Sequence, residues 1–312
     1  MNDFPDDLFD EKKIKKAVRR GKMKTIITVI IISILVFIVL NIANYAISAN
    51  YSEKAFKQWD AYVRLSTPNG YISETVESRG LLGGVSNYEI SKDFKIKSVV
   101  IERKQYSFGL LPSVLTSRYS GGKIGGRDKD WHFGYKENGW REMMFFHPNV
   151  SYKKYKNDEE QIERIQGDKI YEVALSFDRP YKPGEIFVQL PEMTWFWIDT
   201  YSSEQVNVFQ QDAKEYDGSS TFIREYDALG FSINRPYISI HDLEGDYEEF
   251  LELLQMSISP DHHNAFNKMK DVKLEDVGIL GVVVYGTKAE IVEILKEPMI
   301  KASSVGGVIE NY

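Results

Sequence analysis

Hydrophobic and polar positions divide the chain into a short charged start, an apolar stretch and a long mixed remainder. Residues 25–49 are almost wholly apolar, and within 26–40 only Thr28 and Ser33 interrupt the run. As a helix this segment reaches roughly 37 Å, which is enough for the ~30 Å hydrocarbon core of a bilayer with some tilt. An amphipathic helix of a soluble protein would show a polar face, and none appears here. The pattern therefore predicts one transmembrane helix at 25–49.

The charges around this helix predict which end lies inside the cell. Residues 1–24 hold eight Lys and Arg against five Asp and Glu, while residues 25–50 hold no charge. By the positive-inside rule the N-terminus is cytoplasmic. The expected organisation is a single-pass protein of the cell membrane, in four parts: a cytoplasmic tail at 1–24, the membrane helix at 25–49, a membrane-proximal extracellular region at 50–155 and a C-terminal extracellular domain at 156–312.

A cleaved signal peptide is the alternative interpretation of the apolar stretch. Ala46 and Ser48 supply the small residues that a cleavage site needs. The charged region that precedes the stretch is long, however, and the apolar run exceeds the usual length of about 7–15 residues in a signal peptide. The sequence therefore favours a permanent anchor.

Beyond the membrane the pattern predicts strands and a few helices. Alternating or continuous apolar runs indicate strands at 95–102, 171–177, 186–190, 193–201 and 279–285. A helix is expected at 246–256, capped by Asp246. A second is expected at 287–296, where Thr287 and Glu290 form a capping box, and an extended return follows it. We therefore expect an α+β fold with a mainly antiparallel or mixed sheet.

Composition narrows the functional class of the outer region. The residues after 50 carry 31 basic and 41 acidic side chains, and this net charge of −10 makes direct nucleic-acid binding a poor prospect. The chain has no cysteine, which excludes disulfides, a thiolate nucleophile, a cysteine zinc site and a lipoprotein anchor. A large extracellular domain without disulfides is more typical of a bacterium than of a eukaryotic secretory pathway.

The sequence offers no convincing catalytic, cofactor or metal site. Gly121 and Gly126 have the spacing of a phosphate-binding loop, but Arg127 and Asp128 stand where Lys and Ser or Thr are required. The adjacent pair formed by His262 and the next residue lacks the spacing of a metal motif. We therefore expect no enzyme, no cofactor and no metal.

Two Ser-x-x-Lys matches leave a membrane-anchored serine hydrolase as a weak alternative. They are Ser120 with Lys123 and Ser151 with Lys154. Such matches arise by chance in a chain rich in Ser and Lys, and the companion Lys-Thr-Gly element of penicillin-recognising enzymes is missing.

Two groups of side chains are candidates for binding. In the tail, Phe4, Leu8, Phe9 and Ile14 form a short apolar stripe among carboxylates, of the kind that docks into a partner's groove. The basic half of the tail also suits anionic lipid headgroups. In the outer region the strand around Trp195 and Trp197 is a possible ligand platform, although such a strand more often belongs to a core.

The C-terminal residues carry a resemblance to a known family. The string GVVVYGTKAEIVEILKEPMIKASSVGGVIENY at 281–312 has a Val-rich strand, a Gly-Thr turn into a short helix, and then Pro-x-Ile-x-Ala-Ser-x-Val-Gly. It resembles the end of the sigma-factor regulator C-terminal domain, a module of membrane-bound anti-sigma factors in low-GC Gram-positive bacteria. YEVALSFDRPY at 171–181, MTWFWIDTY at 193–201, STPNGY at 66–71 and GLLGG at 80–84 are similar to other parts of the family.

The resemblance implies a regulator that holds an extracytoplasmic-function sigma factor inactive at the membrane until an envelope stress signal arrives. A tail of about 24 residues without cysteine is too short for the zinc-binding anti-sigma domain of other classes, so a linear motif would bind the sigma factor, with a second membrane regulator as a possible helper. The alternative is an extracellular module that binds a cell-wall or envelope ligand and has no transcriptional role.

Overall fold

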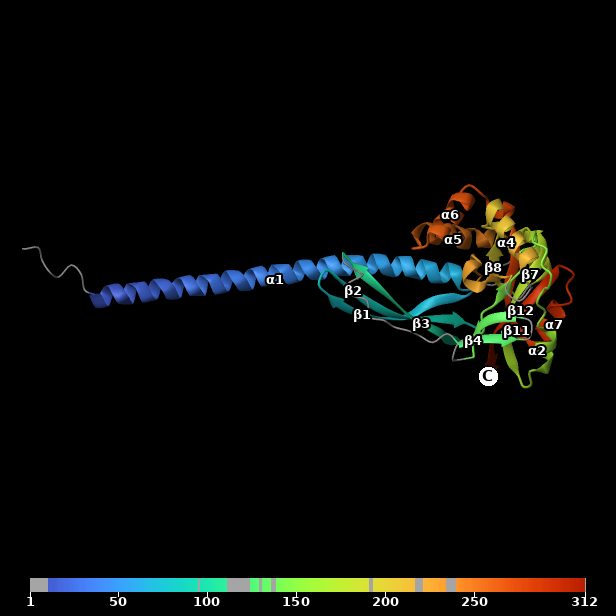
Figure 1. Ribbon diagram of the computed structural model, residues 1–312, viewed down its shortest axis with the longest axis horizontal. Coiled ribbons are helices and arrows are strands. Elements are labelled where there is room, and N and C mark those ends of the chain that lie inside the picture. Colours follow the sequence, from blue (N-terminus) through green and yellow to red (C-terminus); the bar gives the residue numbers. More distant parts are fainter. Residues whose placement is uncertain are drawn as a thin grey trace, which may run out of the picture.

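The computed structural model describes residues 11–94, 96–110, 124–128, 131–135, 139–190, 193–216, 221–233 and 240–311. Its first element is a single helix, α1 (Glu11–Ser66), of 56 residues and therefore about 84 Å in length. The helix is long and apolar enough to cross a membrane once, and none of its apolar window is buried against the protein. Figure 1 shows this part of α1 standing free of the rest of the chain. The predicted segment 25–49 lies wholly inside α1.

The second half of α1 lies along a three-stranded antiparallel sheet. Its strands are β1 (Gly70–Gly80), β2 (Gly83–Asp93) and β3 (Ser98–Gly109), in the order β1-β2-β3. Aromatic contacts fasten the sheet to the helix, since the indole of Trp59 stacks on the ring of Tyr106 at 5.9 Å. The turn between β1 and β2 points back along α1 toward its N-terminal half (Figure 1).

A larger antiparallel sheet follows in the C-terminal half of the chain. Its order is β10-β8-β11-β7-β12, and every neighbouring pair is antiparallel. The strands are β7 (Lys169–Tyr181), β8 (Met193–Ile198), β10 (Gly230–Ser232), β11 (Ile279–Thr287) and β12 (Ile300–Glu310). The α+β class with a mainly antiparallel sheet is confirmed.

Short elements surround the two sheets. Two small strand pairs are β4 (Ile124–Asp128) with β5 (Trp131–Tyr135), and β6 (Met144–Phe145) with β9 (Ile223–Arg224). The helices are α2 (Glu159–Arg164), α3 (Pro183–Gln189), α4 (Ser203–Glu215), α5 (Glu244–Met256), α6 (Pro260–Met269) and α7 (Lys288–Ile294). The described residues also contain the 3-10 turns η3 (Glu225–Asp227), η4 (Ile240–Leu243) and η5 (Leu274–Asp276).

The local predictions met different outcomes. The capping box of α7 is confirmed, because the Glu290 carboxylate accepts a hydrogen bond from the backbone of Thr287 at 2.7 Å. The helix expected at 246–256 is present as α5, but it begins two residues earlier and its N-cap is Leu243 instead of Asp246. The strand predicted at 186–190 is wrong. Pro183 stands in the first turn of a helix there, and that helix, α3, carries its own capping box.

The core lies on both faces of the C-terminal sheet. Along β8 successive side chains point to opposite faces, so Phe196 packs in one cluster with α5 and α6, while Trp195 and Trp197 pack in the other. The second cluster also contains residues of β2, β3 and the end of α1, including Val63 and Tyr88. Residues on both sides of position 155 therefore share one hydrophobic core.

Candidate functional site

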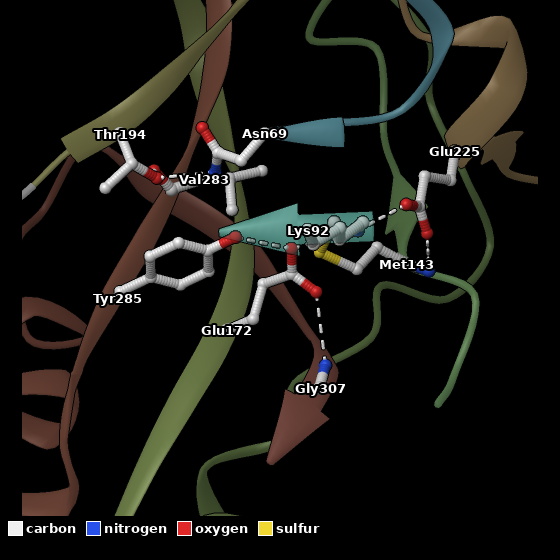
Figure 2. A network of polar contacts seen from close by, with 9 residues as sticks. All are labelled: Asn69, Lys92, Met143, Glu172, Thr194, Glu225, Val283, Tyr285 and Gly307. Atoms are coloured by element: carbon white, nitrogen blue, oxygen red, sulfur yellow. Dashed lines mark hydrogen bonds and ion pairs between the residues drawn. The ribbon is translucent and has the colours of Figure 1, made fainter. Parts of the chain in front are cut away.

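A buried ionic cluster joins the two sheets. Lys92, near the end of β2, places its ammonium 2.9 Å from the carboxylate of Glu172 on β7 and 2.6 Å from that of Glu225 in η3. The side chains of Lys92 and Glu172 have no exposed surface at all. Figure 2 shows the three residues converging from three separate elements. We call Lys92, Glu172 and Glu225 the buried cluster.

Further donors complete the coordination of both carboxylates. The Tyr285 hydroxyl and the Gly307 backbone N–H each donate to Glu172 at 3.2 Å, and the Met143 backbone N–H donates to Glu225 at 3.0 Å. The Lys92 ammonium also lies 5.0 Å from the centre of the Trp140 ring. Such a fully hydrogen-bonded arrangement is what a buried ion pair requires, because each charge has lost its water.

A neutral branch of the network starts three residues after the end of α1. Asn69, in the left-handed region at φ 55°, donates through its amide to the Thr194 hydroxyl at 2.8 Å. That hydroxyl donates in turn to the Val283 carbonyl at 3.1 Å (Figure 2). The turn that ends α1 is thereby hydrogen-bonded to β8 and linked through it to β11.

Burial and charge act against each other in the buried cluster. Burial alone would lower the pKa of Lys92, but the two carboxylates outweigh it and hold that pKa above its ordinary value. Burial raises the pKa of Glu172 to about 7 despite the opposing charge of Lys92, and the Glu225 carboxylate adds to the rise. The protonated form of Glu172 is therefore favoured more than that of an ordinary glutamate.

Two glycines of the last strand, β12, leave the space that the buried cluster occupies. A Cβ added at Gly306 would lie 2.4 Å from a carboxylate oxygen of Glu172, and one at Gly307 would lie 2.3 Å from the Trp140 ring. The preceding serines are also buried and bonded, since the Ser304 hydroxyl accepts from the Met144 backbone N–H at 3.1 Å. Of the motif Ala-Ser-x-Val-Gly at 302–306, Gly306 thus lies directly against the buried cluster.

A second set of contacts holds the end of α1 against α5 and α6. The Ser66 hydroxyl lies 3.2 Å from Nε2 of His262, whose Nδ1 lies 2.7 Å from the Ser257 hydroxyl. The Tyr62 ring stacks on the His262 imidazole at 5.3 Å. Burial lowers the pKa of His262 to about 4, so the ring is neutral at physiological pH. On the surface, Arg64 pairs with Glu249 at 2.8 Å.

The charged and polar groups of this arrangement hold elements of the fold together. Lys92 and Glu172 are closed off from solvent and cannot reach a substrate. Within the described ranges no group of three or more His, Cys, Asp or Glu side chains is placed to hold a metal ion. The buried cluster connects the three-stranded sheet to the C-terminal half. The His262 contacts connect the end of α1 to the same half.

The side chains predicted to bind a partner are only partly visible. Phe4, Leu8 and Phe9 lie outside the described residues. Ile14 lies in the first turns of α1 with 45% of its surface exposed. Both Trp195 and Trp197 are fully buried and pack against Phe145, so in this structure neither indole offers a face to a ligand.

The residues behind the weaker alternatives do not form a closed site within the part of the chain that the structure describes. Ser151 and Lys154 both lie exposed on the surface, whereas Ser120 and Lys123 fall outside the described residues. His262 is buried and its neighbour in α6 is exposed, as expected for adjacent positions on a helix.

Sequence reasoning missed the buried cluster, although one signal for it was present. Glu172 stands within the apolar strand 171–177, where an unpaired carboxylate would be costly. A buried partner of opposite charge could have been inferred from it. Nothing in the local sequence identified that partner as Lys92, which lies 80 positions earlier between polar neighbours.

Comparison with known proteins places two family models on the chain in order. The model described as sigma factor regulator N-terminal matches residues 14–97, and the one described as sigma factor regulator C-terminal matches residues 162–307. The first covers most of α1 with β1 and β2, and the second covers nearly all of the C-terminal sheet. No curated protein and no solved structure matches the chain significantly.

Proposed function

Because this chain belongs to the sigma factor regulator family, we propose that it is a membrane-anchored anti-sigma factor that sequesters an extracytoplasmic-function sigma factor. The family implies a sigma factor as partner and a regulatory role instead of an enzymatic one. The observation that carries the proposal is the order of the two matched models along one chain, with a single apolar helix running through the first of them.

The proposed topology puts the N-terminus in the cytoplasm and everything after residue 49 outside. The eight basic residues of the tail support this orientation through the positive-inside rule. Retention of the helix as an anchor is supported by its continuity. Cleavage after Ser48 would cut α1 in its middle, at a side chain that is buried against the rest of the protein.

In this proposal the tail holds the sigma factor. Its apolar residues Phe4, Leu8, Phe9 and Ile14 would enter a groove of the partner, and the acidic segment DDLFDE would meet a basic, DNA-facing surface. The exposure of Ile14 is consistent with this role. The basic residues closer to the membrane would lie on anionic lipid headgroups.

The outer domain, in the same proposal, responds to envelope stress. A change there must reach the tail through α1, and the buried cluster and the His262 contacts are the places where α1 and its sheet meet the C-terminal half. A second membrane regulator would assist at the bilayer. We propose that loss or rearrangement of these contacts alters how the tail presents its binding residues.

Co-purification of the full-length chain from membranes of its own host tests the tail. The wild-type protein should carry an extracytoplasmic-function sigma factor that mass spectrometry identifies. Replacing Phe4, Leu8 and Phe9 together by Ala should remove that sigma factor. The matched control Val208→Ala changes an exposed apolar residue of α4 and should retain it.

Retention of the sigma factor by the triple variant would show that the tail stripe is not the binding element. Absence of any sigma factor from the wild-type preparation, under conditions in which regulators of this kind are active, would contradict the anti-sigma role itself.

A further inference from the structure

The turn between β1 and β2 is attached to the membrane helix by two hydrogen bonds. The Asn44 side chain accepts from the backbone N–H of Leu82 at 2.6 Å and donates to the carbonyl of Gly80 at 3.1 Å. Asn44 lies inside the predicted membrane segment 25–49. The turn is therefore held at a fixed height along α1, beside residues that the membrane is expected to contact.

The tip of this turn is apolar and exposed. Leu81 has 77% of its surface accessible, the highest value recorded for a large apolar side chain in the described part of the chain. Leu110, just after β3, is 51% exposed, and its backbone N–H donates to the carbonyl of Leu82 at 3.0 Å. Two leucines thus stand out from the same end of the sheet, where a soluble protein would place polar residues.

The polar residues near the tip suit a membrane interface. The Arg79 guanidinium lies 5.1 Å from the centre of the Tyr45 ring and 2.9 Å from the Glu77 carboxylate. Tyr and Arg are residues that anchor proteins at the level of lipid headgroups. Between residues 78 and 84 the turn contains no acidic residue. A groove of about 440 Å³ runs between helix and turn, lined by Ile42 and Tyr45 on one side and Arg79 on the other.

The height of the turn agrees with the thickness of a bilayer. About 20 helical residues span the hydrocarbon core, so a span that begins at Ile26 ends near Tyr45. That is the level at which Asn44 holds the turn. The side chains of α1 between Ile26 and Leu40 are exposed and almost wholly apolar, which makes lipid the neighbour that surrounds the turn on its open side.

We infer that the β1–β2 turn is a membrane-inserting element, in which Leu81 enters the outer leaflet while Arg79 and Tyr45 lie among the lipid headgroups. The inference rests on the proposed membrane anchoring. The occupant of the exposed apolar tip is lipid, because the tip continues the apolar surface of a helix that lipid must cover. The outer domain would then contact the bilayer at two places, the helix and this turn, and its tilt relative to the membrane would be restricted.

Single-cysteine labelling can test the depth of Leu81 directly, because the wild-type chain contains no cysteine. The variants Leu81→Cys, Ile34→Cys and Val208→Cys are each labelled with bimane in the full-length protein, reconstituted in nanodiscs of phosphatidylcholine and phosphatidylglycerol. Ile34 is the control inside the apolar stretch and Val208, exposed on α4, is the control in water. Matching melting temperatures confirm that the labelled variants remain folded.

Bimane at position 81 should emit at shorter wavelength than bimane at position 208 and should lose emission when lipids with a doxyl group near the headgroup are added. Position 34 should respond most strongly to lipids with a deep doxyl group. If position 81 behaves like position 208 while position 34 is quenched, the inference fails and the anchoring stands. If position 34 is not quenched, the anchoring itself fails. If position 81 is shielded from water but unaffected by doxyl lipids, a second chain or another protein covers the turn, and the inference is again overturned.

Discussion

The ammonium of Lys92 lies 2.9 Å from the carboxylate of Glu172, although the two residues belong to different sheets and are 80 positions apart in the chain. Neither side chain is accessible to solvent. The pair connects the sheet that accompanies the membrane helix with the sheet that forms the C-terminal half. Breaking the Lys92–Glu172 pair therefore tests how strongly the two sheets are held together.

Replacing Lys92 by Met should destabilise the protein by about 3–5 kcal/mol, because two buried carboxylates would lose their cation. The loss should be larger at pH 8 than at pH 5, since protonation of Glu172 relieves part of the repulsion at lower pH. Chemical unfolding of the full-length protein in detergent, followed by tryptophan fluorescence, measures both effects. The control Lys57→Met removes an exposed pair with Glu53 and should leave the unfolding midpoint unchanged. Equal effects of the two substitutions would contradict the role of the buried cluster.

The ionisation of Glu172 should make its contribution to stability fall as pH rises. Its pKa is about 7 in the folded protein against an ordinary value of 4.5, so between these values the folded state binds the proton more tightly. Stability contributed by this group is complete below pH 4.5 and is lost as pH rises through 7. The difference in free energy of unfolding between wild type and Glu172→Gln should change with pH in this window.

The difference between the two proteins is the quantity to measure, because other groups titrate in the same range. Burial also raises the pKa of Asp227, to about 6, and lowers that of His147 to about 4. Glu310→Gln, at an exposed carboxylate on β12 that pairs with Lys169, provides the matched control. A flat difference for Glu172→Gln would show that Glu172 has the same pKa folded and unfolded.

Gly306 should tolerate no larger residue. The Cβ of Gly306→Ala would lie 2.4 Å from a Glu172 carboxylate oxygen and 2.8 Å from the Cγ of Met143. We expect a loss of about 1–3 kcal/mol in thermal or chemical unfolding, from overpacking of a closed site. Gly245→Ala, in the first turn of α5 with no atom within 4 Å of the new Cβ, should instead raise stability by about 0.4–1 kcal/mol. Loss of stability in both variants would indicate that the close approach at Gly306 is not the cause.

His262→Ala should loosen the end of α1. It removes the ring that stacks on Tyr62 and bonds the Ser66 and Ser257 hydroxyls, and we expect a loss of about 1–3 kcal/mol at pH 7. The pKa of His262 is about 4 when folded against 6.5 when unfolded, so its contribution is present above pH 6.5 and fades as pH falls toward 4. His263→Ala changes the exposed neighbour and serves as control. A loss of stability that does not depend on pH would contradict the neutral, buried state of His262.

The elements with a strong local signal could be predicted from the sequence. The apolar run at 26–40, the capping box at Thr287 and the continuous apolar strand at 279–285 each specify their structure through nearby residues. The segment 186–190 was wrongly predicted as a strand because its apolar residues suit a strand or a helix. The proline in the first turn favours the helix that is observed. β1 was not predicted, since most of its side chains are exposed and its polar sequence has no apolar period.

Of the three residues of the buried cluster, only Glu172 could be predicted from the sequence. The sequence indicates a buried charge at Glu172 because this residue interrupts an apolar strand. Lys92 and Glu225, by contrast, resemble surface residues in their local sequence. Their pairing depends on how two sheets and a 3-10 turn meet, which is a property of the whole fold. The glycines at 306 and 307 likewise acquire a reason only when the neighbouring rings and carboxylate are in place.

The uniform apolar surface of α1 in its free half has a mechanical consequence. A helix with a polar stripe would resist turning about its axis in lipid, because the stripe would have to remain directed at a polar neighbour. Between 26 and 40 the only interruptions are Thr28 and Ser33, whose hydroxyls can bond back to helix carbonyls, so every azimuth is nearly equal in energy to the bilayer. This stretch does not itself fix the rotation of α1 about its axis, which is left to contacts made elsewhere along the helix, such as Trp59 with Tyr106 and Ser66 with His262.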